Sequence, residues 1–388
     1  MFMKATIILG SVLFGYSVLS LIVPLQVRRR WKLLLCVPLA IVAYKFQILH
    51  GLWGGHFFRP AVPAWVELGS NWLFMALLML VALLLMSDLV RVPAWRVLRK
   101  RLPGWRKLHN SLNLVLLLLA LATTARGVHN AFALPLVREQ VIHLPGLRVP
   151  VRLAMLTDLH ADRHKDATFF REIVKRANEL QADAVVITGD FEDGSLQELA
   201  PALAPLSELQ SRWGTFAVDG NHDYFSGHDA WQSYLGSLGI RFLNNEHTLP
   251  GEGELVLAGV TDPAASRCNE PPPDIARAIA GAPAGKPIVL LAHQPGQAVQ
   301  AAQLGVELQL SGHTHGGHAP GVRQLIARFN HGLAQGLYRL GDTQVYVSNA
   351  TSLWSGFPLR LFTPAEITHL HLLPEDAPAP GNNHRSIH

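Results

Sequence analysis

Four long apolar stretches in the first 131 residues constrain the fold of this chain more than any other feature. They cover residues 5–26, 33–50, 70–90 and 111–131. Each is close to the roughly 20 residues that a helix needs to cross a lipid bilayer. The sequence therefore predicts a membrane region over residues 1–131 with about four transmembrane helices, as in a multi-pass integral membrane protein.

The second stretch has an alternative interpretation, as an interfacial or buried helix, because it contains Pro38, Lys45 and Gln47. The basic loops favour a span. Residues 27–32 and 91–107 are rich in Lys and Arg, and four spans place both loops on one side, where the tendency of basic loops to stay cytoplasmic is satisfied. Both termini are then expected on the outer side of the inner membrane, so the second half of the chain is expected to be extracytoplasmic.

Charge divides the chain at the same place. Residues 1–145 hold 16 Lys and Arg against 3 Asp and Glu, whereas residues 146–388 hold 17 against 25, giving net charges of +13 and −8. A nucleic-acid-binding protein needs its basic charge on a folded face. Here the basic excess lies in the apolar half, so no nucleic-acid partner is expected.

The second half has the pattern of one α/β domain over residues 148–373, preceded by a linker at 132–147 and followed by a disordered tail at 374–388. Apolar residues at helical spacing predict a helix over about 166–181. Short apolar runs predict buried strands, and the alternation of strands and helices indicates layered α/β structure. These runs are Arg152–Leu156, Ala184–Thr188, Thr215–Val218, Leu255–Val260, Pro287–Ala292 and Val306–Leu310.

Polar residues with carboxylate, amide or imidazole side chains follow five of these strands. They are Asp158–Leu159–His160, Gly189–Asp190, Gly220–Asn221–His222–Asp223, His293, and Gly312–His313–Thr314–His315. The carboxyl ends of neighbouring strands in an α/β sheet converge on one crevice. Each motif alone is more typical of a turn or a structural histidine. Their joint occurrence at successive strand ends favours a metal centre.

This pattern, D-x-H, G-D, G-N-H-D, a later His and G-H-x-H, resembles that of the calcineurin-like metallophosphoesterases over residues 150–373. The G-H-T-H-G-G variant at 312–317, with the preceding apolar stretches, resembles their membrane-anchored branch. The resemblance implies a four-layer αββα sandwich and a dinuclear metal centre. Mixed imidazole and carboxylate ligands suit two divalent ions of manganese, iron or zinc better than calcium.

The resemblance also implies a role for each motif residue. One ion would be held by Asp158, His160 and His315, and the other by Asn221, His293 and His313. Asp190 would bridge the two ions, since a carboxylate can give one oxygen to each. His222 would be the catalytic histidine beside the leaving group, held in place by Asp223.

The expected function is hydrolysis of a phosphomonoester, phosphodiester or pyrophosphate bond in a phosphorylated substrate, and a lipid-linked substrate is one form it could take. The alternatives are a membrane sensor or transporter-like protein with a regulatory phosphoesterase-fold domain, and a binding module with a degenerate site. The unbroken motif set favours the enzyme. Five aromatic residues are expected either to form an apolar rim for lipid or to pack in the core, namely Tyr224, Phe225, Trp231, Trp354 and Phe357.

Overall fold

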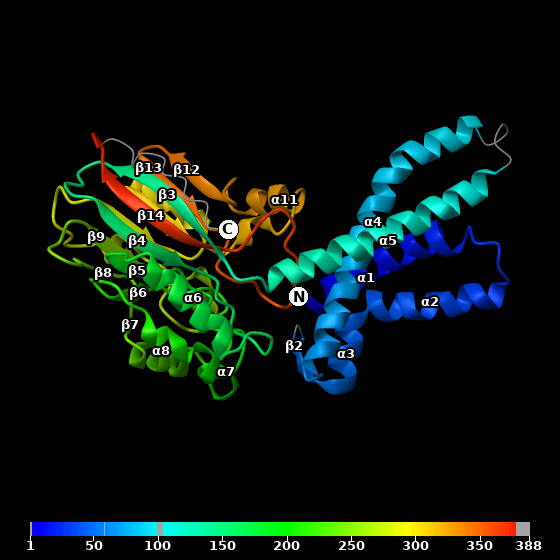
Figure 1. The fold of residues 1–388 in the computed structure, drawn as a ribbon, viewed down its shortest axis with the longest axis horizontal. Helices are drawn as coiled ribbons and strands as arrows, with labels where there is room; N and C mark the ends of the chain where they lie inside the picture. The colour runs from blue at the N-terminus through cyan, green and yellow to red at the C-terminus, as the bar shows by residue number, and fades with distance from the viewer. Residues whose placement is uncertain (1, 58, 99–103, 378–388) are drawn as a thin grey trace. The chain divides into compact units, whose positions relative to one another are not determined.

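The computed structural model describes residues 2–57, 59–98 and 104–377, which form two compact units (Figure 1). The first unit consists of Met1–Asn130 with Ser355–Leu359, and the second of Ala131–Trp354 with Arg360–His388. The first is helical and the second is an α/β domain. The boundary between them follows Asn130, at the end of the fourth apolar stretch.

Three described helices of the first unit are long and apolar enough to cross a membrane: Met3–Ile22, Ala64–Ala94 and Trp105–Ala131. They lie in α1 (Phe2–Ser17) with the π-helical turn η1 (Val18–Ile22), in α4 (Ala64–Leu98) and in α5 (Trp105–Ala131). A two-residue strand pair, β1 (Gly55–His56) and β2 (Arg59–Pro60), precedes α4.

The second apolar stretch does not form one straight span. It lies within α2 (Arg29–Ala43) and α3 (Lys45–Trp53), which meet at a bend of 74°. Lys45 is buried at this bend, and its ammonium group donates to the side chain of Asn71. The expected count of four spans is therefore not confirmed: the described helices give three, or four if the bent pair is one broken span. Arg99, Lys100 and Arg101 of the second basic loop lie outside the described residues.

Two six-stranded mixed sheets form the framework of the second unit (Figure 1). The first sheet has the order β3 (Leu136–Leu144), β14 (Glu366–Pro374), β4 (Val151–Leu156), β5 (Ala184–Ile187), β6 (Thr215–Ala217) and β7 (Ile240–Phe242). The second has the order β12 (Gly336–Leu340), β13 (Thr343–Val347), β11 (Leu308–Ser311), β10 (Ile288–Leu291), β9 (Val256–Gly259) and β8 (Glu246–Thr248).

The inner faces of the two sheets share one apolar core, in which Leu153 and Val186 of the first sheet pack with Leu257 and Leu310 of the second. Burying one such side chain contributes about 1.5–3 kcal/mol. Helices cover the outer faces: α6 (Ala167–Glu179), α7 (Leu196–Leu203) and α8 (His228–Ser237) on the first sheet, α9 (Ile275–Ile279) and α10 (Ala298–Gln303) on the second. The order of layers is thus helix, sheet, sheet, helix.

Further helices lie in the connections between these elements. They are η2 (Ala204–Glu208), η3 (Pro263–Arg267), η4 (Pro295–Gln297), η5 (His315–Gly317) and α11 (Val322–Phe329).

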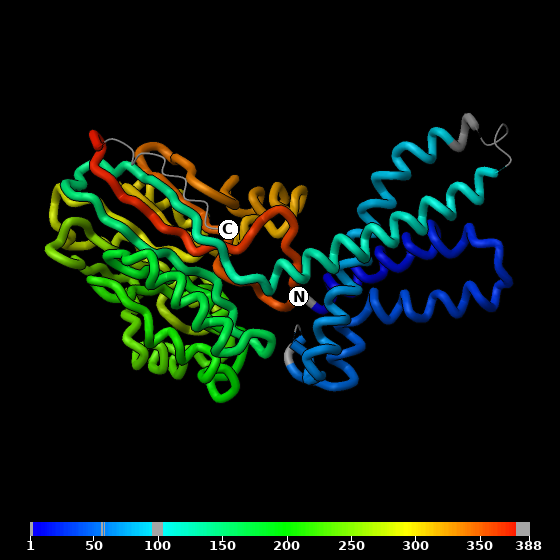
Figure 2. The backbone as a smooth tube through the Cα atoms, viewed as in Figure 1, coloured from blue at the N-terminus to red at the C-terminus, as the bar shows by residue number. Residues whose placement is uncertain are grey.

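The linker expected at residues 132–147 contains β3, an edge strand that pairs in parallel with β14 along its whole length (Figure 2). The sequence signal for β3 was weak because most of its residues are exposed or half-buried, as suits an edge strand. Only residues 132–135 separate α5 from β3. The tail was expected from residue 374, where β14 ends, and residues 378–388 lie outside the described residues.

Candidate metal centre

The five polar motifs lie just beyond the carboxyl ends of β4, β5, β6, β10 and β11. Backbone hydrogen bonds tie the loops together: Asp158 N–H donates to the carbonyl of Gly189 at 2.9 Å, and Gly312 N–H donates to the carbonyl of His293 at 3.0 Å. The fold therefore brings together residues that are up to 157 positions apart in the sequence, from Asp158 to His315.

Five of the seven predicted metal ligands have left-handed backbone conformations, with φ between 44° and 68°. These are Asp158, His160, Asp190, His313 and His315. Non-glycine residues rarely adopt this region, and they cluster at functional sites where the surrounding structure compensates for the strain. The conformations of these loops, as well as the directions of the strands, therefore determine where these side chains point.

Two motif glycines are required by close packing around the same carboxylates. A Cβ atom on Gly312 would lie 2.2 Å from Oδ2 of Asp158, and one on Gly220 would lie 2.2 Å from Oδ1 of Asp190. No real Cβ atom tolerates such contacts. Glycine at these positions lets the neighbouring loop approach the carboxylate.

Asp158, His160 and His315 form the first compact group, and all three are buried. The Nε2 atoms of His160 and His315 face each other at 3.3 Å, and His315 Nε2 lies 3.6 Å from Asp158 Oδ1. Two buried imidazole nitrogens and a carboxylate oxygen directed at one point fit a shared cation, since buried polar atoms need partners.

Asp190 lies between this group and a second one. Its Oδ2 atom is 3.5 Å from Nε2 of His160 and 3.2 Å from Nε2 of His293. Nδ1 of His293 donates to the carbonyl oxygen of Thr188 at 2.7 Å. Such a bond on one ring nitrogen orients the ring and leaves the other nitrogen for a ligand.

Asn221 and His313 lie beside the second group rather than within the three-residue clusters. The side-chain oxygen of Asn221 is buried and has no hydrogen-bond partner among the described residues, which fits an atom reserved for a metal. The His313 ring centroid is 5.1 Å from that of His293. Burial and the charge of His293 lower the pKa of His313 to about 3, so its ring is neutral, as a metal ligand must be.

Asp193 is a residue of the site that belongs to none of the five sequence motifs. Its Oδ1 accepts from Nδ1 of His222 at 2.6 Å, and its Oδ2 accepts from Nδ1 of His160 at 3.1 Å. One carboxylate thus orients a predicted ligand and the predicted catalytic histidine. The available signal was its position, three residues after Asp190 at the same strand end.

The expectation that Asp223 holds His222 is corrected by this geometry. The Asp223 carboxylate instead accepts backbone N–H bonds from Asp190 at 2.8 Å, Phe191 at 2.7 Å and Gly220 at 2.7 Å. Asp223 therefore fixes the loops after β5 and β6, because its side chain turns toward their amides, and Asp193 takes the position beside the imidazole.

The electrostatics of the site depend on the balance between burial and charge. Burial alone would raise the pKa of Asp190, but the neighbouring imidazoles of His293, His222 and His160 hold it well below its usual value. Burial alone would lower the pKa of His222, but Asp190 and Asp193 raise it to about 9. The result is an ionised carboxylate beside a histidine that readily holds a proton.

Five aromatic residues were expected either to form an apolar rim or to pack in the core, and the structure places them differently. Trp231 and Tyr224 are buried in apolar clusters. Phe225 is 60% exposed, and the ring centroids of Phe225 and Trp354 lie 6.3 Å and 5.5 Å from that of His222. Phe357 belongs to the helical unit. Two aromatic rings therefore border the predicted catalytic histidine.

Comparison with known proteins agrees with this geometry. The calcineurin-like phosphoesterase family matches residues 151–317. An uncharacterized metallophosphoesterase of Helicobacter pylori strain J99 is 36% identical over 280 residues, which cover 71% of this chain and 74% of that protein. A transmembrane protein with metallophosphoesterase domain from Bos taurus is 31% identical over 361 residues, covering 88% of this chain and 80% of that protein.

A second protein of the latter name, from Danio rerio, is 35% identical over 262 residues, covering 63% of this chain and 59% of that protein. The similarity to these transmembrane proteins agrees with the apolar helices of the first unit, which could span a membrane. The matched family region contains each motif from Asp158 to His315. The chain therefore belongs to the calcineurin-like metallophosphoesterases, enzymes that hydrolyse phosphoric ester bonds.

Proposed function

We propose that the chain is a membrane-anchored phosphoesterase that works through a dinuclear metal centre. The observation that carries this proposal is the position of Asp190, whose Oδ2 atom lies within 3.5 Å of imidazole nitrogens from both groups. A carboxylate so placed can share its oxygens between two cations about 3.5–4 Å apart.

The proposed ligand sets follow the two groups. The first ion would be held by Asp158, His160 and His315, the second by Asn221, His293 and His313, and both by Asp190. Bound divalent ions would lower the pKa of water to supply the nucleophile and would neutralise charge on the phosphoryl group. Manganese, iron and zinc suit this donor set.

His222 is proposed as the general acid that protonates the leaving-group oxygen. Its Nδ1 is held by Asp193, so Nε2 is the atom available to donate toward substrate. Positioned acids of this kind contribute about 10²- to 10⁴-fold to rate. Asp193 would keep the ring oriented and favour its protonated form.

The proposed substrate carries a phosphomonoester, phosphodiester or pyrophosphate group next to an apolar part. The exposed ring of Phe225 and the half-buried ring of Trp354, both beside His222, support the apolar part. The short connection at residues 132–135 supports a lipid-linked substrate at the bilayer surface, since four residues extend at most about 14 Å. We propose that the α/β unit works on the extracytoplasmic side of the inner membrane, because the basic loops are expected in the cytoplasm.

A substrate panel with controlled metal tests this function. The protein purified in detergent is stripped with a chelator and assayed before and after addition of manganese, iron or zinc. The panel contains aryl and alkyl phosphomonoesters, phosphodiesters and lipid pyrophosphates. Metal-dependent hydrolysis of one class supports the proposal and names the bond. The proposal is contradicted if hydrolysis is unaffected by the chelator, or if no hydrolysis is seen after any of the three metals is added.

A second candidate function, a sensor or transporter-like protein, is favoured by one feature of the helical unit. The buried Arg91 guanidinium donates to Oδ1 of Asn113 at 2.6 Å and lies 3.4 Å from Asp88. Buried charges within membrane helices often mark functional sites. A cellular phenotype that survives in an Asp190→Asn variant lacking hydrolysis would favour this candidate over the enzyme.

A further inference from the structure

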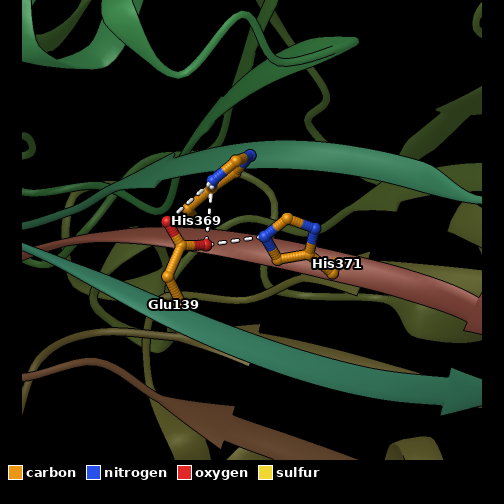
Figure 3. A group of neighbouring side chains, drawn as sticks. All are labelled: Glu139, His369 and His371. Carbon is orange, nitrogen blue, oxygen red and sulfur yellow. Dashed lines mark hydrogen bonds and ion pairs between the residues drawn. The ribbon is translucent and has the colours of Figure 1, made fainter. Parts of the chain in front are cut away.

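A second cluster of ligand-type side chains lies in the middle of β3 and β14, among residues that belong to none of the five motifs. It consists of Glu139 on β3 and of His369 and His371 on β14 (Figure 3). We call it the strand-pair cluster. The strand-end ligand set described above includes none of the three.

Strand geometry brings these side chains to one face. His369 and His371 are two residues apart, so they point to the same side of β14. Leu370 and Leu372, their neighbours, belong to the core between the sheets, which places the histidines on the opposite, outer face. Parallel pairing sets Glu139 directly across from His369.

The carboxylate of Glu139 is the point on which both imidazoles converge (Figure 3). Its Oε2 atom lies 3.0 Å from Nδ1 of His369 and 2.6 Å from Nε2 of His371. The two ring centroids are 4.2 Å apart. One potential ligand atom from each residue lies within 4.8 Å of those of the other two.

The three side chains of the cluster differ in how much of their surface is exposed to solvent. The side chain of His369 is 9% exposed, that of His371 is 25% exposed and that of Glu139 is 59% exposed. The buried ring is held by its strand, whereas the exposed carboxylate can adjust. An ion could therefore enter from solvent and keep a water molecule as a further ligand.

We propose that the strand-pair cluster is a mononuclear site for a divalent transition metal of the zinc type, held by Glu139, His369 and His371. Two imidazoles and one carboxylate are an established ligand set for Zn²⁺, with bonds of about 2.0–2.1 Å and a fourth position open to water. Ligand atoms around such a tetrahedral ion are about 3.3 Å apart. The two nitrogen–oxygen separations, 3.0 Å and 2.6 Å, would need to widen by less than about 1 Å.

The charge of the site agrees with a divalent ion. Neutral imidazoles and one carboxylate leave the occupied site with a single positive charge. Arg152 is the cross-strand partner of His371 on β4, and its positive charge acts on His369. Its side chain is exposed, so solvent screens that repulsion.

Metal binding here would fasten the edge strand β3 to β14. The expected consequence is a higher unfolding temperature in the presence of zinc, because a ligand that binds only the folded state stabilises it. The site is independent of the proposed phosphoesterase centre, so its test does not depend on hydrolysis.

The test compares metal content among matched variants of the full-length protein in detergent. Wild type, His371→Ala, Glu139→Gln and His143→Ala are stripped with chelator, loaded with zinc, passed through gel filtration and analysed by elemental mass spectrometry. His143 is a matched control because it lies on the same strand but bonds the carbonyl of Pro374 instead. Circular dichroism establishes that each variant is folded.

We expect wild type and His143→Ala to retain one more equivalent of zinc than His371→Ala or Glu139→Gln. A His371→Cys variant should recover the equivalent, because a thiolate ligates zinc, whereas a purely hydrogen-bonding role would not be restored. Cobalt loading should give visible absorption bands in wild type that weaken in His371→Ala. Equal zinc content in wild type and His371→Ala, or a loss in His143→Ala as large as that in His371→Ala, would overturn the proposal.

Discussion

The carboxylate of Asp193 accepts a hydrogen bond from Nδ1 of His222 at 2.6 Å. Its other oxygen accepts from Nδ1 of His160 at 3.1 Å. This single side chain connects the proposed metal ligands to the proposed general acid, so its replacement should affect both the rate and its dependence on pH.

Replacing Asp193 by Asn should lower the rate by about 10- to 100-fold, the usual cost of losing a group that orients a ligand. The pH profile should change as well. Asp190 and Asp193 raise the pKa of His222 to about 9, and a general acid works while it holds its proton, so activity is lost as pH rises through that pKa. Removing one negative charge lowers the pKa of His222.

The alkaline limb of the rate profile should therefore move to lower pH in Asp193→Asn. The measurement is kcat/KM against pH for wild type, Asp193→Asn and Asp342→Asn, whose side chain is fully exposed and serves as control. An unchanged alkaline limb with a reduced rate would assign Asp193 a structural role alone.

Asp223 is predicted to act on stability instead. Its carboxylate accepts three backbone N–H bonds and its residue is 5% exposed. Asp223→Ala leaves these buried donors unpaired, which should lower the free energy of unfolding by about 3 kcal/mol or more. Thermal unfolding compared with the Asp342→Asn control measures this, and a variant as stable as wild type would contradict it.

Gly312→Ala should displace Asp158 and weaken metal binding. The added Cβ would lie 2.1 Å from Oγ1 of Thr157 and 2.2 Å from Oδ2 of Asp158. Gly236→Ala, in α8 with open space around its Cβ position, is the matched control and should be neutral or slightly stabilising. The comparison is metal content per folded chain, and equal retention in both variants would refute the role given to Gly312.

His222→Ala should cost activity while metal content stays near that of wild type. The loss should reach about 10²- to 10⁴-fold, and it should be larger for an alkyl phosphodiester than for an activated aryl one, because a poor leaving group needs the proton more. Metal loss in proportion to the activity loss would place His222 among the ligands.

Membrane topology gives a further prediction. A reporter enzyme that works only outside the cytoplasm should be active when it is fused after Leu373. Protease added to intact spheroplasts should cut the α/β unit. Both results follow from the proposal that the basic loops lie in the cytoplasm. A protected domain would reverse the topology.

Sequence pattern anticipated the strands that lead into the site, because β4, β5, β6, β10 and β11 are short, mostly buried apolar runs. It anticipated β9 for the same reason. It gave no bounds for β3, because most residues of this strand are exposed or half-buried and carry no apolar run. Hydropathy also gave no sign of the 74° bend between Ala43 and Lys45 in the second apolar stretch.

The site was anticipated as a set of residue types but not as a network. The strand-end motifs pointed to Asp158, His160 and Asp190, whereas the family resemblance implied that Asp223 holds His222. The direction in which each carboxylate turns depends on loop conformations, and left-handed residues such as Asp190 set these. Such conformations follow from packing around the site, which spacing along the chain does not encode.

The proposed centre is dinuclear because Asp190 lies between the two groups of ligands, so the decisive experiment is to measure the metal content of an Asp190→Asn variant. Wild type, Asp190→Asn and the exposed-histidine control His331→Asn are dialysed against chelator, reloaded with manganese and analysed for metal and for phosphoesterase activity. We expect two ions per folded chain in wild type and in His331→Asn, with metal loss and no hydrolysis in Asp190→Asn. Full activity and full metal content in folded Asp190→Asn would contradict it.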